Sequence, residues 1–98
     1  MKDLILAKWS EILNILENEH GISHMMIHTW IEPLNIYSVE DNKVYFTLDE
    51  KYGQRGVEFL KNKLFDIYLE TVLREIFQDD KIQVIFTLES QMKKDDKT

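Results

Sequence analysis

Cysteine is absent from this 98-residue sequence, which excludes a disulfide framework and a thiolate metal site. That absence favours a reducing cytoplasm as the compartment. Long apolar runs are also missing. Residues 1–13 carry charges and Trp9 where a signal peptide or a membrane-spanning helix needs an unbroken apolar stretch. We therefore expect a cytoplasmic protein that does not enter a membrane.

Basic residues are fewer than acidic residues. The sequence has 12 Lys and Arg against 18 Asp and Glu, a formal net charge of −6. A domain that binds nucleic acid through its phosphates is usually basic overall. The net negative charge therefore argues against nucleic acid as the main ligand. Residues 43–63 still hold five basic side chains against three acidic ones, which leaves room for a modest basic patch.

The residues that catalysis needs are not arranged for it. No Gly-x-Ser-x-Gly nucleophile elbow occurs, and carboxylates such as Asp79 and Asp80 stand in turn or tail segments where water solvates them. We predict that the protein is not an enzyme and needs no cofactor.

Three histidines, His20, His24 and His28, are spaced by four residues. On a continuous helix they would share one face and could bind Zn²⁺ or Ni²⁺ through imidazole. Gly21 interrupts that helix, and no His-Glu-x-x-His motif occurs. Surface or partly packed histidines are the favoured interpretation, and we predict no metal site.

Glycine and proline are scarce, three and one residues respectively, and they mark the ends of predicted helices. A first amphipathic helix begins near Asp3 and ends at Gly21. A short second helix begins at Ser23 and ends before Pro33. The apolar stripe of the first helix consists of Ile5, Trp9, Ile12, Leu13 and Leu16.

The rest of the chain alternates between strand and helix patterns. Residues 34–39 and 43–48 predict an antiparallel hairpin that turns at Asp41 and Asn42. An apolar stripe over residues 57–77 predicts one long helix of about twenty residues, and alternation over residues 82–88 predicts a last strand.

The predicted order is helix, helix, strand, strand, helix, strand, which defines an α+β fold with a three-stranded sheet packed against helices. The length suits a single domain. We place this domain at residues 1–89, and residues 90–98 read as a polar tail or the start of a linker.

Three segments resemble the N-terminal domain of the bacterial chromosomal replication initiator DnaA. They are "KWSEILNILENE", "HTWIEPLNIYSVEDNKVYFTLDEKY" and "KIQVIFTL", and together the similarity covers about residues 4–88. The order and spacing of seven residues carry it: Trp9, Trp30, Ile31, Pro33, Leu34, Asn42 and Tyr52.

The resemblance implies a KH-like fold and a protein–protein interaction module. In that family this domain self-associates through its first helix, helps to load the replicative helicase and receives regulators of initiation. ATP and origin DNA are handled by later domains, and no G-x-x-x-x-G-K-[ST] phosphate loop occurs in this sequence. The chain would then be an excised domain or a free-standing relative that pairs with the full-length initiator.

The resemblance implies three partner-binding residues. Trp9 stands where the family has its self-association aromatic, although the neighbour that is often apolar is Lys8 here. Tyr52 occupies the place of the aromatic that contacts the helicase. Met26 stands where an acidic helicase contact falls. Because Met25 and Met26 are adjacent, only one can face the core, and the exposed one would be an adaptable contact.

Two aromatic positions have structural interpretations as well. Trp30 and Ile31 precede the helix-ending proline, and we predict that they pack in the core against the sheet. The periodicity leaves open whether Trp9 is buried or exposed.

The residues Gly53, Gln54, Arg55 and Gly56 form a G-x-x-G segment. Such a loop clamps a nucleic-acid backbone in KH domains, so weak binding of single-stranded DNA or RNA is an alternative function. Residues 49–52 offer only one turn where a KH domain has a full helix. The favoured interpretation is that both glycines let the chain bend into the long helix.

Overall fold

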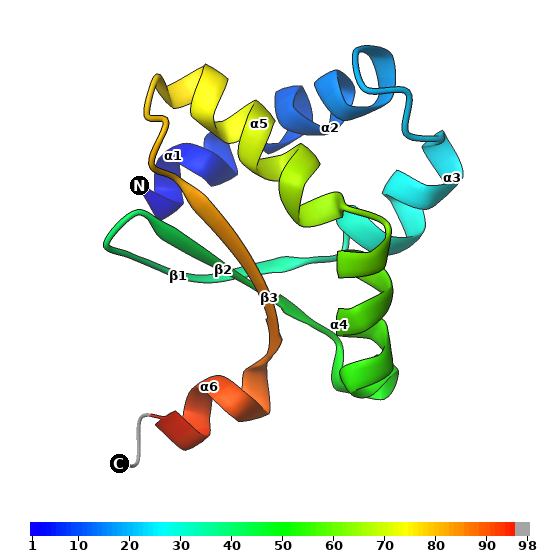
Figure 1. The fold of residues 1–98 in the computed structure, drawn as a ribbon, viewed down its shortest axis with the longest axis vertical. Coiled ribbons are helices and arrows are strands. Elements are labelled where there is room, and N and C mark those ends of the chain that lie inside the picture. Colours follow the sequence, from blue (N-terminus) through cyan, green and yellow to red (C-terminus); the bar gives the residue numbers. More distant parts are fainter. Residues whose placement is uncertain (96–98) are drawn as a thin grey trace.

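The structure, a computed structural model, describes residues 1–95, with side chains described through residue 92. The fold is α+β, as predicted, with a three-stranded sheet packed against helices (Figure 1). The elements in order are α1 (Lys2–Ala7), α2 (Trp9–Asn18), α3 (His24–Met26), the π-helical turn η1 (Ile27–Ile31), β1 (Asn35–Glu40), β2 (Lys43–Leu48), the 3-10 turn η2 (Glu50–Tyr52), α4 (Gly53–Asn62), α5 (Phe65–Phe77), β3 (Gln83–Leu88) and α6 (Glu89–Asp95).

The sheet is mixed, with the order β1-β2-β3. β1 and β2 are antiparallel, and their predicted turn is confirmed: Asp41 and Asn42 have φ angles of 50° and 70°. Positive φ at both central residues is the signature of the tight hairpin turn that matches strand twist. β3 runs parallel to β2, because the chain crosses over through α4 and α5 before it returns.

One face of the sheet supplies half of the core. Phe46 is fully buried at the centre of β2, and its parallel partner Phe86 in β3 is buried beside it. The helices bury Ile12, Leu60, Leu69 and Leu73 against this face, among others. The alternation of apolar residues along each strand therefore does place one sheet face under the helices.

Each of the two longest predicted helices is in fact a pair. The first divides at Lys8 into α1 and α2, and the second divides at Leu64 into α4 and α5. Leu64 is left-handed, with a φ of 63°. A helix of twenty residues would be about 30 Å long, whereas a six-residue strand spans only about 20 Å. The break at Leu64 lets both halves pack on β3 (Figure 1).

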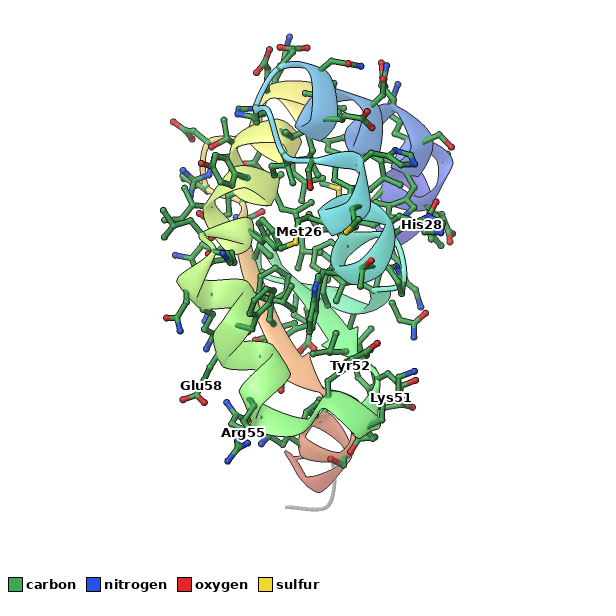
Figure 2. The ribbon with its side chains drawn as sticks, turned by 90° about the vertical axis from the view of Figure 1, so that its right-hand side faces the viewer. Met26, His28, Lys51, Tyr52, Arg55 and Glu58 are labelled. Carbon is green, nitrogen blue, oxygen red and sulfur yellow. The ribbon has the colours of Figure 1, made fainter. Side chains whose placement is uncertain are left out.

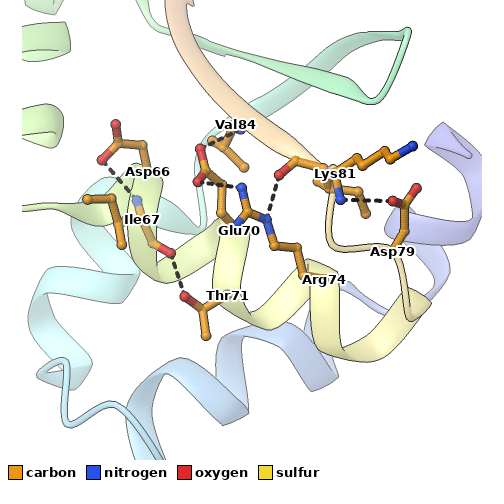
Figure 3. Close-up of polar contacts among 9 residues, drawn as sticks. Asp66, Ile67, Glu70, Thr71, Arg74, Asp79, Lys81 and Val84 are labelled. Atoms are coloured by element: carbon orange, nitrogen blue, oxygen red, sulfur yellow. Dashed lines mark hydrogen bonds and ion pairs between the residues drawn. The ribbon is translucent and has the colours of Figure 1, made fainter.

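An ion pair on α5 protects the outer edge of β3 (Figure 3). Arg74 Nε donates to the carbonyl oxygen of Ile82 at 2.8 Å, and Glu70 Oε2 accepts from the backbone N–H of Val84 at 3.0 Å. Arg74 Nη2 and Glu70 Oε1 lie 3.3 Å apart. The two side chains thus satisfy backbone groups that an edge strand would otherwise leave unpaired.

The predicted polar tail is helical over most of its length. Residues 89–95 form α6, and residues 96–98 lie outside the described part of the chain. Glu50 Oε2 accepts from the backbone N–H of Ser90 at 3.3 Å, and Gln91 Nε2 donates to Gln54 Oε1 at 3.3 Å. These bonds attach α6 to η2 and α4. Within residues 1–95, no helix has the length and apolar character needed to span a bilayer.

Candidate partner-binding surface

Trp30 joins the turn η1 to the segment around α4. Its ring centroid lies 5.0 Å from that of Tyr52 and 4.4 Å from that of Phe59. Trp30 is only half-buried, so the predicted core position is corrected: it packs on Tyr52 and Phe59 rather than deep against the sheet. Ile31 is fully buried, as predicted.

Tyr52 lies at the surface on top of Trp30 because η2 fixes its backbone. Asp49 Oδ1 accepts from the backbone N–H of Lys51 at 3.0 Å, which caps this turn. The Lys51 ammonium lies 5.1 Å from the centroid of the Tyr52 ring, a cation–π contact. Tyr52 is half-buried, so part of its ring remains available to a partner.

The predicted contact Met26 lies on the same side of the molecule as Tyr52 (Figure 2). Met26 is half-buried against the core, whereas its neighbour Met25 is 74% exposed. The adaptable exposed methionine is therefore Met25, and Met26 offers only part of its side chain. Figure 2 shows Arg55 and Glu58 of α4 on this side as well.

We call Met26, Lys51, Tyr52, Arg55 and Glu58 the Tyr52 face. Lys51, Arg55 and Glu58 are exposed polar residues. An aromatic anchor with packed support behind it and charged residues around it is the usual anatomy of a protein interface.

Trp9 belongs to another part of the surface. It is half-buried and stacks on Phe46, with ring centroids 5.7 Å apart and an interplanar angle of 30°. Phe46 lies within β2, whereas Tyr52 lies beyond the end of that strand. On α1, just before Trp9, Leu4 and Leu6 are 57% and 52% exposed. The three predicted partner residues thus do not form one patch.

The G-x-x-G segment forms the first turn of α4 rather than a loop between two helices. Gly53 has φ 59° and ψ −163° at the entrance to the helix. A Cβ atom on Gly56 would lie 2.5 Å from Leu48 Cδ2 and 2.6 Å from Tyr52 Cβ. Gly53 therefore shapes the bend into the helix, as predicted, whereas Gly56 has a helical backbone and is needed for close packing rather than for a bend.

Nucleic-acid binding by this segment stays a prediction. Gln54 and Arg55 are exposed and reachable. The carboxylates of Asp49, Glu50 and Glu58 are also exposed near the start of α4, and negative charge there opposes the approach of phosphate.

Gly21 separates His20 from His24 and His28, as predicted. His20 packs against Tyr68, with ring centroids 5.6 Å apart. His24 and His28 stack with centroids 6.1 Å apart, and each Nδ1 faces a carboxylate oxygen, at 3.2 Å in Glu17 and at 2.6 Å in Glu32 respectively. Among the side chains that the structure describes, those of residues 1–92, no three of His, Cys, Asp or Glu are grouped to hold a metal ion.

The sequence is 37% identical over 98 residues to the chromosomal replication initiator protein DnaA of Lachnoclostridium phytofermentans. The match covers 99% of this chain and 21% of that protein, so the chain spans about a fifth of the length of this relative. No protein-family model and no solved structure matches the sequence.

Proposed function

We propose that this chain, a relative of the N-terminal domain of the replication initiator DnaA, works in the initiation of DNA replication as a protein-binding module. Its partner is the replicative helicase or a regulator of initiation, bound through the Tyr52 face. The observation that carries the proposal is the partly exposed side chain of Tyr52, whose ring centroid lies 5.0 Å from that of Trp30 behind it. A rigid aromatic ring loses little conformational freedom when it is buried in an interface.

Replacing Tyr52 by alanine tests the proposal. We expect Tyr52→Ala to weaken binding to the replicative helicase of the same organism by at least ~1 kcal/mol, about a fivefold rise in Kd, because the anchor is lost. Isothermal titration calorimetry measures this change. Because Tyr52 also packs on Trp30, a circular dichroism melt must show that the variant is folded at the titration temperature.

Tyr68→Ala is the matched control. It removes another half-buried tyrosine, which packs on His20 rather than on the Tyr52 face. Its helicase affinity should equal that of the parent chain. If Tyr52→Ala left the helicase affinity unchanged, or if both variants lost the same affinity, the Tyr52 face would not be the binding site.

We also propose that α1 mediates association with a second copy of this domain or with full-length DnaA. Leu4 and Leu6 support this, because two large apolar side chains stay more than half exposed on one short helix. Residues two positions apart on a helix point to different sides, so Leu4 and Leu6 present apolar surface on two sides of α1. Trp9, three positions after Leu6 at the start of α2, is half-buried.

The double variant Leu4→Glu/Leu6→Glu should raise the Kd of self-association roughly tenfold or more, since charge replaces apolar contact area. Both side chains are exposed, so the fold should survive. Analytical ultracentrifugation over a concentration series measures the change. Ile67→Glu, at an exposed apolar position of α5, is the control and should associate normally. A parent chain that is monomeric at all concentrations would contradict this part of the proposal.

A further inference from the structure

A cavity of about 440 Å³ opens beside Tyr52, where β2 ends and α6 begins. Among the side chains that the structure describes, three carboxylates line it, those of Asp49, Glu50 and Glu89, and one cation, Lys51. The Lys51 ammonium lies over the Tyr52 ring, 5.1 Å from its centroid. The described lining therefore carries more negative than positive charge, and its remaining walls include both apolar and hydroxyl groups.

One wall residue, Thr47, is almost fully buried, and its hydroxyl is open only toward the cavity. It is 3% exposed and is the only polar or charged residue classed as buried in the described part of the chain. Its hydroxyl makes no hydrogen bond to any described residue, yet no side-chain polar atom there is fully enclosed without a partner. The hydroxyl is therefore reached through the cavity that Thr47 lines. A ligand that displaces water from this hydroxyl must hydrogen-bond to it, because a polar group that is buried without a partner costs free energy.

The carboxylates are held in place by backbone groups. Asp49 Oδ1 accepts from the N–H of Lys51 at 3.0 Å, and Glu50 Oε2 accepts from the N–H of Ser90 at 3.3 Å. The second oxygen of each carboxylate has no partner among the described residues. The cavity thus offers fixed acceptors, and a complementary ligand must carry several donors and positive charge.

We propose that this cavity receives an arginine side chain of the protein partner. The inference rests on the proposed function and specifies the chemistry that the partner brings to the Tyr52 face. A guanidinium has five N–H donors in a planar fork, which suits two carboxylates and a hydroxyl. Its flat faces also pack well on apolar and aromatic walls such as Pro33, Leu48 and Tyr52.

Two other ligand classes fit this cavity less well. Phosphate groups would meet an excess of carboxylate. A bare metal ion needs three or more ligating side chains grouped together, and no such group of His, Cys, Asp or Glu is found among the described side chains of residues 1–92.

The test uses a capped Gly-Arg-Gly peptide and its Gly-citrulline-Gly counterpart, in which a neutral urea replaces the guanidinium. Each is titrated into the ¹⁵N-labelled chain at low salt. We expect saturable amide shifts at Thr47, Asp49 and Glu50 with the arginine peptide, and binding at least tenfold weaker with citrulline. Equal binding of both peptides, tighter binding of a Gly-Lys-Gly peptide, or an absence of saturable shifts would overturn the proposal.

Variants locate the binding to the cavity. Asp49→Asn/Glu50→Gln keeps the side-chain oxygens that accept from the backbone N–H groups of Lys51 and Ser90, but it removes two negative charges. It should weaken binding of the arginine peptide roughly tenfold or more. Glu75→Gln/Asp80→Asn removes the same charge from exposed positions outside the cavity and should bind as the parent does. Thr47→Val should lower the affinity for the arginine peptide about threefold to tenfold. Equal binding by both double variants would refute the site.

The helicase titration separates this inference from the proposed function. If the arginine peptide fails to bind while Tyr52→Ala still weakens helicase binding, the cavity inference is wrong and the proposed function stands. If the peptide binds as expected while Tyr52→Ala leaves helicase affinity unchanged, the proposed function is wrong and the cavity remains an arginine site.

Discussion

Phe46→Ala should lose about 3–5 kcal/mol of unfolding free energy, because it removes a fully buried ring from the centre of the sheet. The ring stacks on Trp9 at 5.7 Å and lies 6.3 Å from Phe86, so it joins the helices to two strands. A domain of this size is commonly stable by only about 5–15 kcal/mol. The loss would therefore be a large fraction of the total stability.

Urea denaturation followed by circular dichroism measures this loss. Tyr45→Ala is the matched control, because Tyr45 is the preceding residue of β2, is half-buried and points to the opposite face of the sheet. We expect a clearly smaller loss for it. If Phe46→Ala lost no more stability than Tyr45→Ala, the core described here would be wrong.

Gly53→Ala and Gly56→Ala should each lose roughly 1–3 kcal/mol of unfolding free energy, for different reasons. Gly53 has φ 59° and ψ −163°, a conformation that only glycine adopts readily. Gly56 has an ordinary helical backbone, but a Cβ there would lie 2.5 Å from Leu48 Cδ2 and 2.6 Å from Tyr52 Cβ. Overpacking of that kind forces Leu48, Tyr52 or α4 to shift.

Thermal and urea unfolding of the two variants test these roles. Gln54→Ala lies between the two glycines at an exposed position and should change stability by well under ~1 kcal/mol. If a glycine served only as a flexible part of a helix, its replacement with alanine would raise the unfolding free energy of the protein by about 0.5–1 kcal/mol. A gain in both glycine variants would contradict the structural roles assigned to them.

The hairpin was predictable because its signals are local. Asp41 and Asn42 tolerate positive φ, and the β-branched and aromatic residues on both sides alternate between the two faces of the sheet. The end of the first helical region at Gly21 and the cap at Ser23 are local in the same way: Ser23 Oγ accepts from the backbone N–H of Met26 at 3.2 Å.

The helix breaks were not predictable, because no local signal marks them. Lys8 and Leu64 are ordinary helix formers, and the apolar stripe runs through both positions. The break at Leu64 follows from the need to fit two helical segments on one short sheet, with Phe65 turned into the core after an exposed Leu64. Tertiary packing overrides helix propensity at such positions.

The candidate site could be predicted only in part. Tyr52 was predicted from the resemblance. The ring that packs behind it belongs to Trp30, which we predicted in the core. The cavity gathers residues from β1, β2, η2 and α6, among them Thr47 and Glu89. These residues are far apart in the sequence, so no local pattern brings them together before the fold is known.

We propose that the Tyr52 face binds a protein partner in replication initiation. Titrating the ¹⁵N-labelled chain with the replicative helicase of the same organism, and following backbone amide signals, tests it most directly. We predict that signals of Met26, Lys51, Tyr52 and Arg55 shift or broaden first, while those of Asp80 and Lys81 stay unchanged. An absence of any change at high helicase concentration, or changes confined to residues outside the Tyr52 face, would contradict it.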